Sequence, residues 1–129
     1  MQLGPLDHVN IRTANLESMI TWYQDILGMT LGKRPPFRFP GAWLYTGEQA
    51  AVHLISVEKP ALGKDPKLEH FAFSATGLTS FIEVLENKKI DYRLDRVPEF
   101  GILQVNFFDP DGNHIHVDFI GPETEGQTV

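Results

Sequence analysis

Five histidines are the strongest candidates for metal chemistry in this 129-residue sequence. Neutral imidazole is a common ligand for zinc, iron, nickel and copper. The sequence has no cysteine, so a bound ion would have to use His, Asp, Glu or backbone oxygen. His114, His116 and Asp118 alternate along a segment that is expected to be a β-strand, and alternate strand residues point to the same face.

An internal repeat distinguishes His116 from its neighbours. His8 and His70 lie 62 positions apart (70 − 8), and His53 and His116 lie 63 positions apart (116 − 53). The two modules of the repeat therefore carry histidine at the same two places. We predict that His8, His53, His70 and His116 are the ligands of one divalent metal ion.

His114 and Asp118 have no such counterparts, because Ala51 and Ile55 occupy the corresponding positions of the first module. We interpret His114 as a residue at the mouth of the site that contacts substrate. Asp118 lies about 7 Å from His116 along a strand, so it is expected to orient His116 or to act as a base. His116 and Asp118 are therefore the catalytic candidates. The alternative for Asp118 is a solvated residue at the end of a strand.

The hydrophobic pattern predicts the same order of elements in both halves of the chain: a strand, a helix and three further strands. The first module is expected to contain a strand at 5–12, a helix between Asn15 and Gly28, and extended runs around 29–34, 42–46 and 50–57. The second module is expected to contain a strand at 69–75, a helix around 78–89, and extended runs near 91–96, 102–108 and 114–120. We predict an α+β fold made of two βαβββ modules.

The segment 58–67, "EKPALGKDPK", is expected to link module 1–57 to module 68–121 within a single domain, because it combines prolines, a glycine and charges. The tail "GPETEGQTV" is polar and is expected to fray.

The predicted faces of the strands place the histidines together. In each of these strands one face is large, apolar and suited to packing under a helix, which leaves the histidines on the opposite face. Two curved sheets of this kind would gather the four histidines in one concave cavity. Asp7 and Glu69 each precede a histidine and are expected to point to the other face. The alternative to a metal site is a polar cavity in which the histidines hydrogen-bond to one another and to water.

Four further residues are candidates for substrate binding. Asn10 and Arg12 share the predicted face of His8, and Gln104 lies on the seventh predicted strand. An inward arginine would suit a carboxylate or phosphate, and the alternative is an exposed arginine at a strand end. Trp43 follows an aromatic, proline-rich loop and is expected to wall an apolar pocket; its alternative role is packing in the core.

The composition argues against several classes of partner. A net charge of −6 does not suit nucleic-acid binding, which needs clustered Lys and Arg. No run approaches the roughly 18 apolar residues of a membrane span, and the N-terminus lacks the basic and apolar segments of an export signal. We therefore expect a cytoplasmic protein that acts on a small molecule.

Four segments of the chain resemble the vicinal oxygen chelate superfamily, which contains glyoxalases, extradiol dioxygenases, fosfomycin-resistance enzymes and bleomycin-binding proteins. They are "DHVNI" (7–11), "WYQDILGM" (22–29), "HFAF" (70–73) and "FFDPDGNHIHV" (107–117). The resemblance implies paired βαβββ modules that form a half-barrel around a divalent metal, with ligands at His8, His53, His70 and His116. It also implies a homodimer in which the first module of one chain and the second module of the other complete each site.

Histidine at all four ligand positions implies a particular chemistry within that superfamily. His116 stands where a ligand glutamate is usual, and four ligands resemble the glyoxalase and epimerase layout. The implied function is a glyoxalase-like lyase or isomerase with one divalent ion per site: zinc, nickel, iron(II) or manganese. The ion would chelate two neighbouring oxygens of a small substrate and stabilise an enolate-like intermediate. Two alternatives stay open: an iron(II)-dependent ring-cleaving dioxygenase of catechol-like substrates, and a metal-free protein that binds a drug-like molecule.

Overall fold

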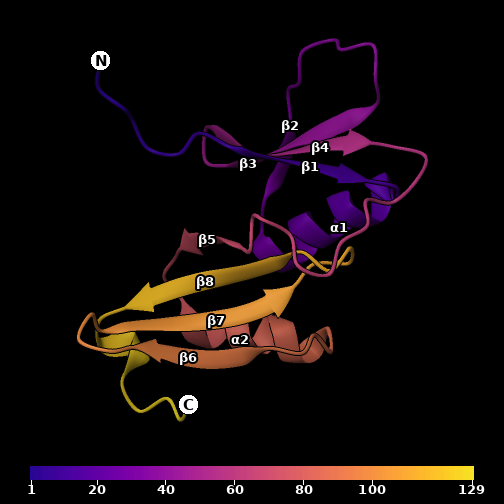
Figure 1. Cartoon of the computed structure of the whole chain (residues 1–129). Helices are drawn as coiled ribbons and strands as arrows, with labels where there is room; N and C mark the ends of the chain where they lie inside the picture. The colour runs from indigo at the N-terminus through magenta and orange to yellow at the C-terminus, as the bar shows by residue number, and fades with distance from the viewer. The chain divides into compact units, whose positions relative to one another are not determined.

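The computed structural model describes residues 1–129, and the chain divides into two compact units, Met1–Lys64 and Asp65–Val129. This division falls within the predicted linker, 58–67. Each unit contains one four-stranded mixed sheet and one α-helix, in the order strand, helix and three strands (Figure 1). The predicted α+β fold with two βαβββ modules is therefore confirmed.

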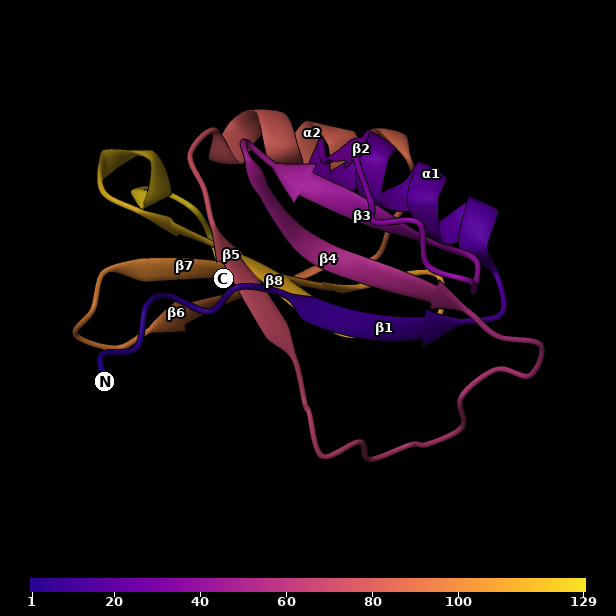
Figure 2. The same ribbon diagram turned by 90° about the horizontal axis from the view of Figure 1, so that it is seen from above.

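The first unit orders its strands β1-β4-β3-β2. Its elements are β1 (Val9–Thr13), α1 (Leu16–Leu27), β2 (Thr30–Gly32), β3 (Gly41–Thr46) and β4 (Gln49–Ser56). Strands β1 and β4 are parallel and run side by side in Figure 2, whereas β3 pairs antiparallel with both β2 and β4.

Helix α1 forms because its apolar residues recur at helical spacing. Met19, Tyr23 and Ile26 are buried, and the helix packs on β2, β3 and β4. Asn15 is the N-cap residue, as predicted, although its side chain makes no capping hydrogen bond. Gly28 follows the helix with a φ of 66°, a left-handed conformation that glycine adopts without steric cost. Because α1 covers one face of the sheet, polar residues of β1 and β4 are left on the other.

The second unit repeats this topology with the strand order β5-β8-β7-β6. Its elements are β5 (Phe71–Ser74), α2 (Leu78–Asn87), β6 (Arg93–Val97), β7 (Ile102–Phe108), β8 (His114–Ile120) and a short 3-10 helix, η1 (Pro122–Thr124). Strand β5 is parallel to β8, as β1 is to β4. The matching topology confirms the repeat.

The apolar core of the second unit lies between its sheet and α2, which Figure 1 shows behind β6 and β7. The ring centroid of Phe81 on α2 lies 5.6 Å from that of Phe107 and 6.1 Å from that of Phe119. Leu85 and Leu103 are also fully buried. Because strand residues alternate, the residues of β7 and β8 between these apolar positions face away from α2.

Neither α1 nor α2 has the length and apolar composition that a membrane-spanning helix requires.

The polar tail does not fray, so that prediction was wrong. Thr124 is buried, and Glu123 Oε2 accepts hydrogen bonds from the backbone nitrogens of Gly77 and Leu78, both at 2.9 Å. These contacts cap the start of α2, whose N-cap glycine has no side chain of its own for this role. The polar composition of the tail therefore gave no indication that Glu123 caps α2.

Candidate functional site

Three aromatic rings stack on the face of the first sheet that lies opposite α1. His53 of β4 is paired with Trp43 of β3 and with Asn10 of β1. The ring centroid of His53 lies 3.9 Å from that of Trp43, with 12° between the planes, and 3.8 Å from that of His8, with 10° between the planes. His53 is thus held between two flat surfaces, and only 7% of it is exposed.

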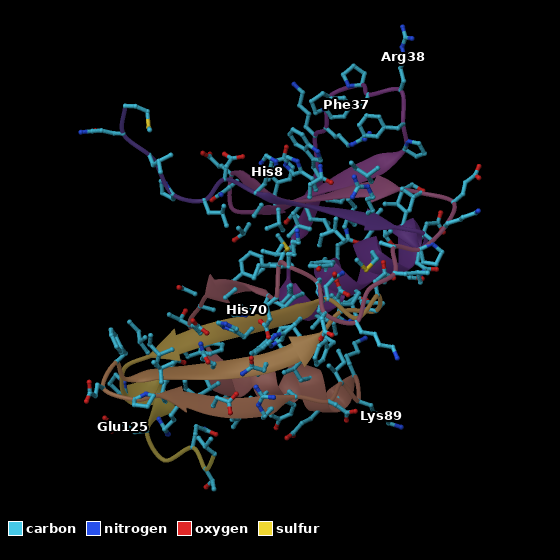
Figure 3. The ribbon with its side chains drawn as sticks, viewed as in Figure 1. His8, Phe37, Arg38, His70, Lys89 and Glu125 are labelled. Carbon is cyan, nitrogen blue, oxygen red and sulfur yellow. The ribbon has the colours of Figure 1, made fainter.

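A pocket of about 940 Å³ opens beside this stack. Its lining combines polar residues with the stacked rings and with aromatic residues of the loop before β3; it includes Asn10, Phe37, Phe39, Trp43, Tyr45 and His53. Figure 3 shows Phe37 and Arg38 on this loop, with Arg38 directed away from the sheet. The volume and the mixture of aromatic and polar lining are typical of a pocket for a small molecule.

Hydrogen bonds set the tautomers of the two histidines in the first unit. His8 Nδ1 donates to Asp7 Oδ2 at 2.6 Å, and His53 Nε2 donates to the carbonyl oxygen of Ala50 at 3.0 Å. Because these oxygens only accept, each donating nitrogen carries the hydrogen. Burial, reinforced by the nearby His8, lowers the pKa of His53, so this ring is neutral at pH 7. In their neutral forms the rings therefore present lone pairs on Nε2 of His8 and Nδ1 of His53.

The stack itself does not suit the binding of one ion by both rings. A ligating imidazole nitrogen lies about 2.1 Å from zinc, and the ion lies close to the plane of the ring. Two almost parallel rings whose centroids are 3.8 Å apart cannot both meet this condition. At least one of His8 and His53 must turn out of the stack before the pair can hold an ion.

Three histidines gather on the face of the second sheet that lies opposite α2. His114 and His116 are alternate residues of β8, and His70 directly precedes the parallel neighbour β5 (Figure 3). The ring centroid of His70 lies 4.5 Å from that of His116 and 5.2 Å from that of His114. His116 is buried, whereas 41% of the His70 side chain is exposed. The second unit thus brings two predicted ligands together and adds His114 beside them.

Carboxylates set the tautomers of His70 and His116. His116 Nδ1 donates to Asp118 Oδ1 at 2.6 Å, and His70 Nδ1 donates to Glu69 Oε2. In its neutral form each ring therefore keeps its lone pair on Nε2. A carboxylate that accepts from one ring nitrogen is what orients histidine ligands in metal sites. The contact of Asp118 is the one expected of a residue that orients His116.

Asp7 and Glu69 do not point away from the histidines, so that prediction was wrong. Strand alternation does not apply to them, because β1 begins only at Val9 and β5 only at Phe71. Each acidic side chain is therefore free to fold back onto the imidazole of the next residue.

Glu69 is the residue of this site that strand patterning missed. Its Oε1 lies 3.3 Å from His114 Nδ1, and its Oε2 accepts from His70. The hydrogen bond from His70 lowers the pKa of the Glu69 carboxyl below its usual value. The signal that could have identified Glu69 is the repeat of an acidic residue before His8 and before His70.

A chain of hydrogen bonds holds the ring of His114. Its Nε2 donates to Asn106 Oδ1 at 2.9 Å, and Asn106 Nδ2 donates to Asp95 Oδ2 at 3.1 Å. Arg93 Nη2 lies 2.7 Å from the same Asp95 oxygen. Because Asp95 only accepts, the Asn106 amide must direct its nitrogen to Asp95 and its oxygen to His114.

The predicted substrate contacts are divided between the two units of the chain. Asn10 and Trp43 line the pocket of the first unit, but Arg12 is exposed and does not line it. Gln104 pairs with Asp118 across β7 and β8 in the second unit.

The chain is similar to members of one family in sequence and in fold. Residues 5–117 match the model of the Glyoxalase/Bleomycin resistance protein/Dioxygenase superfamily. "Glyoxylase I 4" of Arabidopsis thaliana is 33% identical over 125 residues, which cover 91% of this chain and 71% of the relative.

Two solved structures share the fold at lower identity. A glyoxylase/bleomycin resistance protein/dioxygenase domain from Frankia sp. EAN1pec has a TM-score of 0.76 at 20% identity, over 93% of this chain and 100% of its own. Lactoylglutathione lyase from Agrobacterium tumefaciens has a TM-score of 0.70 at 18% identity, over 98% of this chain and 100% of its own.

Proposed function

The chain belongs to the Glyoxalase/Bleomycin resistance protein/Dioxygenase superfamily, and from this membership we propose that it is a metal-dependent enzyme of the lyase or isomerase type. Its substrate would be a small molecule with two neighbouring oxygens. The ligands of its divalent ion would be His8, His53, His70 and His116, and the ion would be zinc, nickel, iron(II) or manganese.

The hydrogen bonding of the four imidazoles is the observation that best supports this ligand set. In every ring one nitrogen donates to an oxygen that only accepts: His8 to Asp7, His53 to Ala50, His70 to Glu69 and His116 to Asp118. In its neutral form, each ring keeps a lone pair on its other nitrogen. Three of the four acceptors are carboxylates, which raise the basicity of a ligand imidazole as well as orienting it. The four ring nitrogens that keep a lone pair suit a divalent ion, provided that the stack of His8, His53 and Trp43 opens.

Four neutral ligands would leave the ion its full charge, so that it supplies Lewis acidity toward substrate oxygens. The chain itself must then move the proton. Asp118 is well placed for this role, because its carboxylate is only 24% exposed and hydrogen-bonds to His116. A partly buried carboxylate coupled to an imidazole can accept a proton and return it. Asp118 and His116 would thus take over the task that a ligand glutamate performs elsewhere in the superfamily.

The pocket of the first unit supports a substrate with an apolar or aromatic part. Phe37, Phe39 and Trp43 provide flat apolar surface, and Asn10 offers an amide beside His53. We propose Asn10 and Trp43 as substrate contacts from this unit. Among the other polar residues of the sheets, Arg12, Gln104 and His114 would be the remaining substrate contacts.

We propose that the protein acts as a homodimer in which each site combines the first unit of one chain with the second unit of the other. The ligand pairs lie in separate units of the chain, His8 and His53 in Met1–Lys64 and His70 and His116 in Asp65–Val129. An exchange of equivalent units between two copies would keep every ligand and would produce two equal sites.

Metal analysis joined to an activity assay tests the proposed function. The full chain, purified without chelator, is expected to contain about one divalent ion per chain, and adding that ion back to stripped protein should raise the Tm. Lactoylglutathione is the first compound to assay, because a protein of the same fold is named for it. His116→Ala should lose the metal-dependent gain in Tm, whereas His114→Ala should retain most of it. Protein with no stoichiometric ion and no stabilisation by zinc, nickel, iron(II) or manganese would instead be a metal-free binding protein.

An iron(II)-dependent ring-cleaving dioxygenase is the second candidate function. It is favoured by the two imidazoles and one carboxylate of His70, His114 and Glu69, a donor set that iron(II) oxygenases use. Oxygen uptake with iron(II) and a panel of catechols is the measurement, and turnover of a substrate under anaerobic conditions would rule this candidate out.

A further inference from the structure

We propose that the second unit has a divalent-cation site of its own, formed by Glu69, His70 and His114. Only His70 also belongs to the ligand set of the proposed function, so the two sites are distinct. The donor atoms of the three residues lie within 4.8 Å of one another. A carboxylate and two imidazoles suit zinc with an open coordination position, or iron(II).

The hydrogen bonds of His114 direct its Nδ1 lone pair at Glu69. Because Nε2 donates to the oxygen of Asn106, and Asp95 keeps that amide in place, the hydrogen of the neutral ring lies on Nε2. Nδ1 then faces Glu69 Oε1 at 3.3 Å. Two such acceptors repel each other unless a cation, either a proton or a metal ion, lies between them. Two ligands of a tetrahedral ion, each about 2.1 Å from it, are roughly 3.4 Å apart, which is close to this separation.

His70 can complete the site by changing its tautomer. Its Nδ1 donates to Glu69 Oε2 in the structure. When an ion takes the place of that hydrogen, the proton moves to Nε2 and the ring stays neutral, with its lone pair now on Nδ1. A neutral imidazole has a single lone pair, so His70 can serve one site at a time: this one through Nδ1, or the four-histidine site through Nε2. An ion bound here therefore withdraws His70 from the proposed catalytic site.

The first unit offers no equivalent of this site. An acid–histidine pair precedes the first strand of both units, but Ala51 stands at the position of His114 and Trp43 at that of Asn106. The third ligand and the amide that orients it thus occur in the second unit alone. The site is open to ions from solution, because 71% of the Glu69 side chain is exposed.

Zinc titration of full-length variants tests this site separately from the proposed function. In a His8→Ala/His53→Ala chain, which cannot form the four-histidine site, one zinc ion per chain should still bind. Adding His114→Ala should weaken that binding by about tenfold or more, because it removes a ligand. Adding His116→Ala to the same background should have little effect and is the matched control. Circular dichroism establishes that each variant is folded.

The proposal is overturned if the double variant does not bind zinc, or if His116→Ala weakens binding as much as His114→Ala. Ring-nitrogen NMR of the His8→Ala/His53→Ala chain, in which the four-histidine site cannot engage His70, gives a second measurement. Zinc should shift the Nδ1 resonance of His114, and unchanged His114 resonances up to an excess of zinc would also overturn the proposal. Failure of the proposed function has a different signature: the unsubstituted chain would bind zinc through His114 while His8 and His53 stayed unaffected.

Discussion

Each histidine of the candidate site has its tautomer set by a neighbouring acceptor, and the tautomer decides which nitrogen can bind a metal ion. Carboxylates accept a hydrogen bond from Nδ1 of His8, His70 and His116, which leaves Nε2 as the proposed ligand atom. His53 has the opposite tautomer, because its Nε2 donates a hydrogen bond to the carbonyl oxygen of Ala50. At the scale of single residues, the acceptors are therefore as important to the site as the imidazoles.

Binding of an ion by His8 and His53 should change the fluorescence of Trp43. The three rings form one stack in the structure, and the stack must open when both histidines bind one ion. His53 then either leaves Trp43 or stays against it as a ligand of the cation, so the surroundings of the indole change in both cases and its emission should shift in wavelength or intensity. The chain has two tryptophans, so a Trp22→Phe variant isolates the signal of Trp43. Zinc binding without any change in its emission would contradict ligation by His53, and a Trp43→Phe variant provides the background.

Replacing Asp118 by asparagine should weaken metal binding through a change in the tautomer of His116. The asparagine amide can donate to Nδ1 of His116, which would move the hydrogen of the ring to Nε2, the proposed ligand atom. Loss of such an orienting carboxylate typically reduces metal affinity by about 10- to 100-fold. The Trp43 emission during a zinc titration measures this effect at the four-histidine site. Asp91→Asn, an exposed acid of the same unit, is the control and should behave as the unsubstituted chain does.

The sequence predicted which histidines lie together within each unit better than it predicted their acidic partners. Repeat positions identified His8 and His70 because a duplicated module keeps its spacing. Strand alternation failed for Glu69 because the residue lies two positions before β5 begins, where the backbone no longer follows the pleat. Contacts made just outside a strand depend on its exact first residue, which hydrophobic patterning does not resolve.

At the scale of elements, the C-terminal segment stabilises the second unit more than its composition suggests. Arg96 of β6 donates to the carbonyl oxygens of Thr124 and Gln127, at 2.7 and 2.9 Å. Glu123 accepts from the first backbone nitrogens of α2. The helix itself was predictable from its apolar spacing, but its cap was not, because the capping side chain lies 45 residues away along the chain from Leu78.

Glu123→Ala should destabilise the protein by about 1 kcal/mol, the usual cost of losing an N-cap side chain. The carboxylate satisfies two backbone nitrogens and lies at the positive end of the α2 dipole, so both contributions are lost together. Glu123→Gln should cost less, because its side-chain oxygen still accepts hydrogen bonds. Chemical denaturation is the measurement, with the exposed Glu125→Ala as control; equal stability of the two alanine variants would contradict the capping role.

At the scale of the whole molecule, two units with one topology present different chemistry. The duplicated order of elements along the chain was predictable, since it follows from hydrophobic periodicity and from the position of turns. The difference between the polar faces depends on a few single positions. Trp43 stacks on His53 in the first unit, whereas Asn106 stands at the equivalent position opposite His116 and holds His114. Side-chain contacts of this kind depend on rotamers and local distances that periodicity does not specify.

Complementation between two defective chains should show whether each four-histidine site draws on one copy or on two. His8→Ala damages the first unit and His116→Ala damages the second, so either variant alone should lose the site. When the two variants are unfolded together and refolded as a mixture, about half of the dimers should contain one chain of each kind. If units are exchanged, such a dimer unites the intact first unit of one chain with the intact second unit of the other. About a quarter of all sites should then recover the Trp43 response to zinc, whereas sites built within single chains would recover none.

A His8→Ala chain mixed with a His53→Ala chain is the matched control. Both changes lie in the first unit, so no arrangement of the two chains restores a complete ligand set.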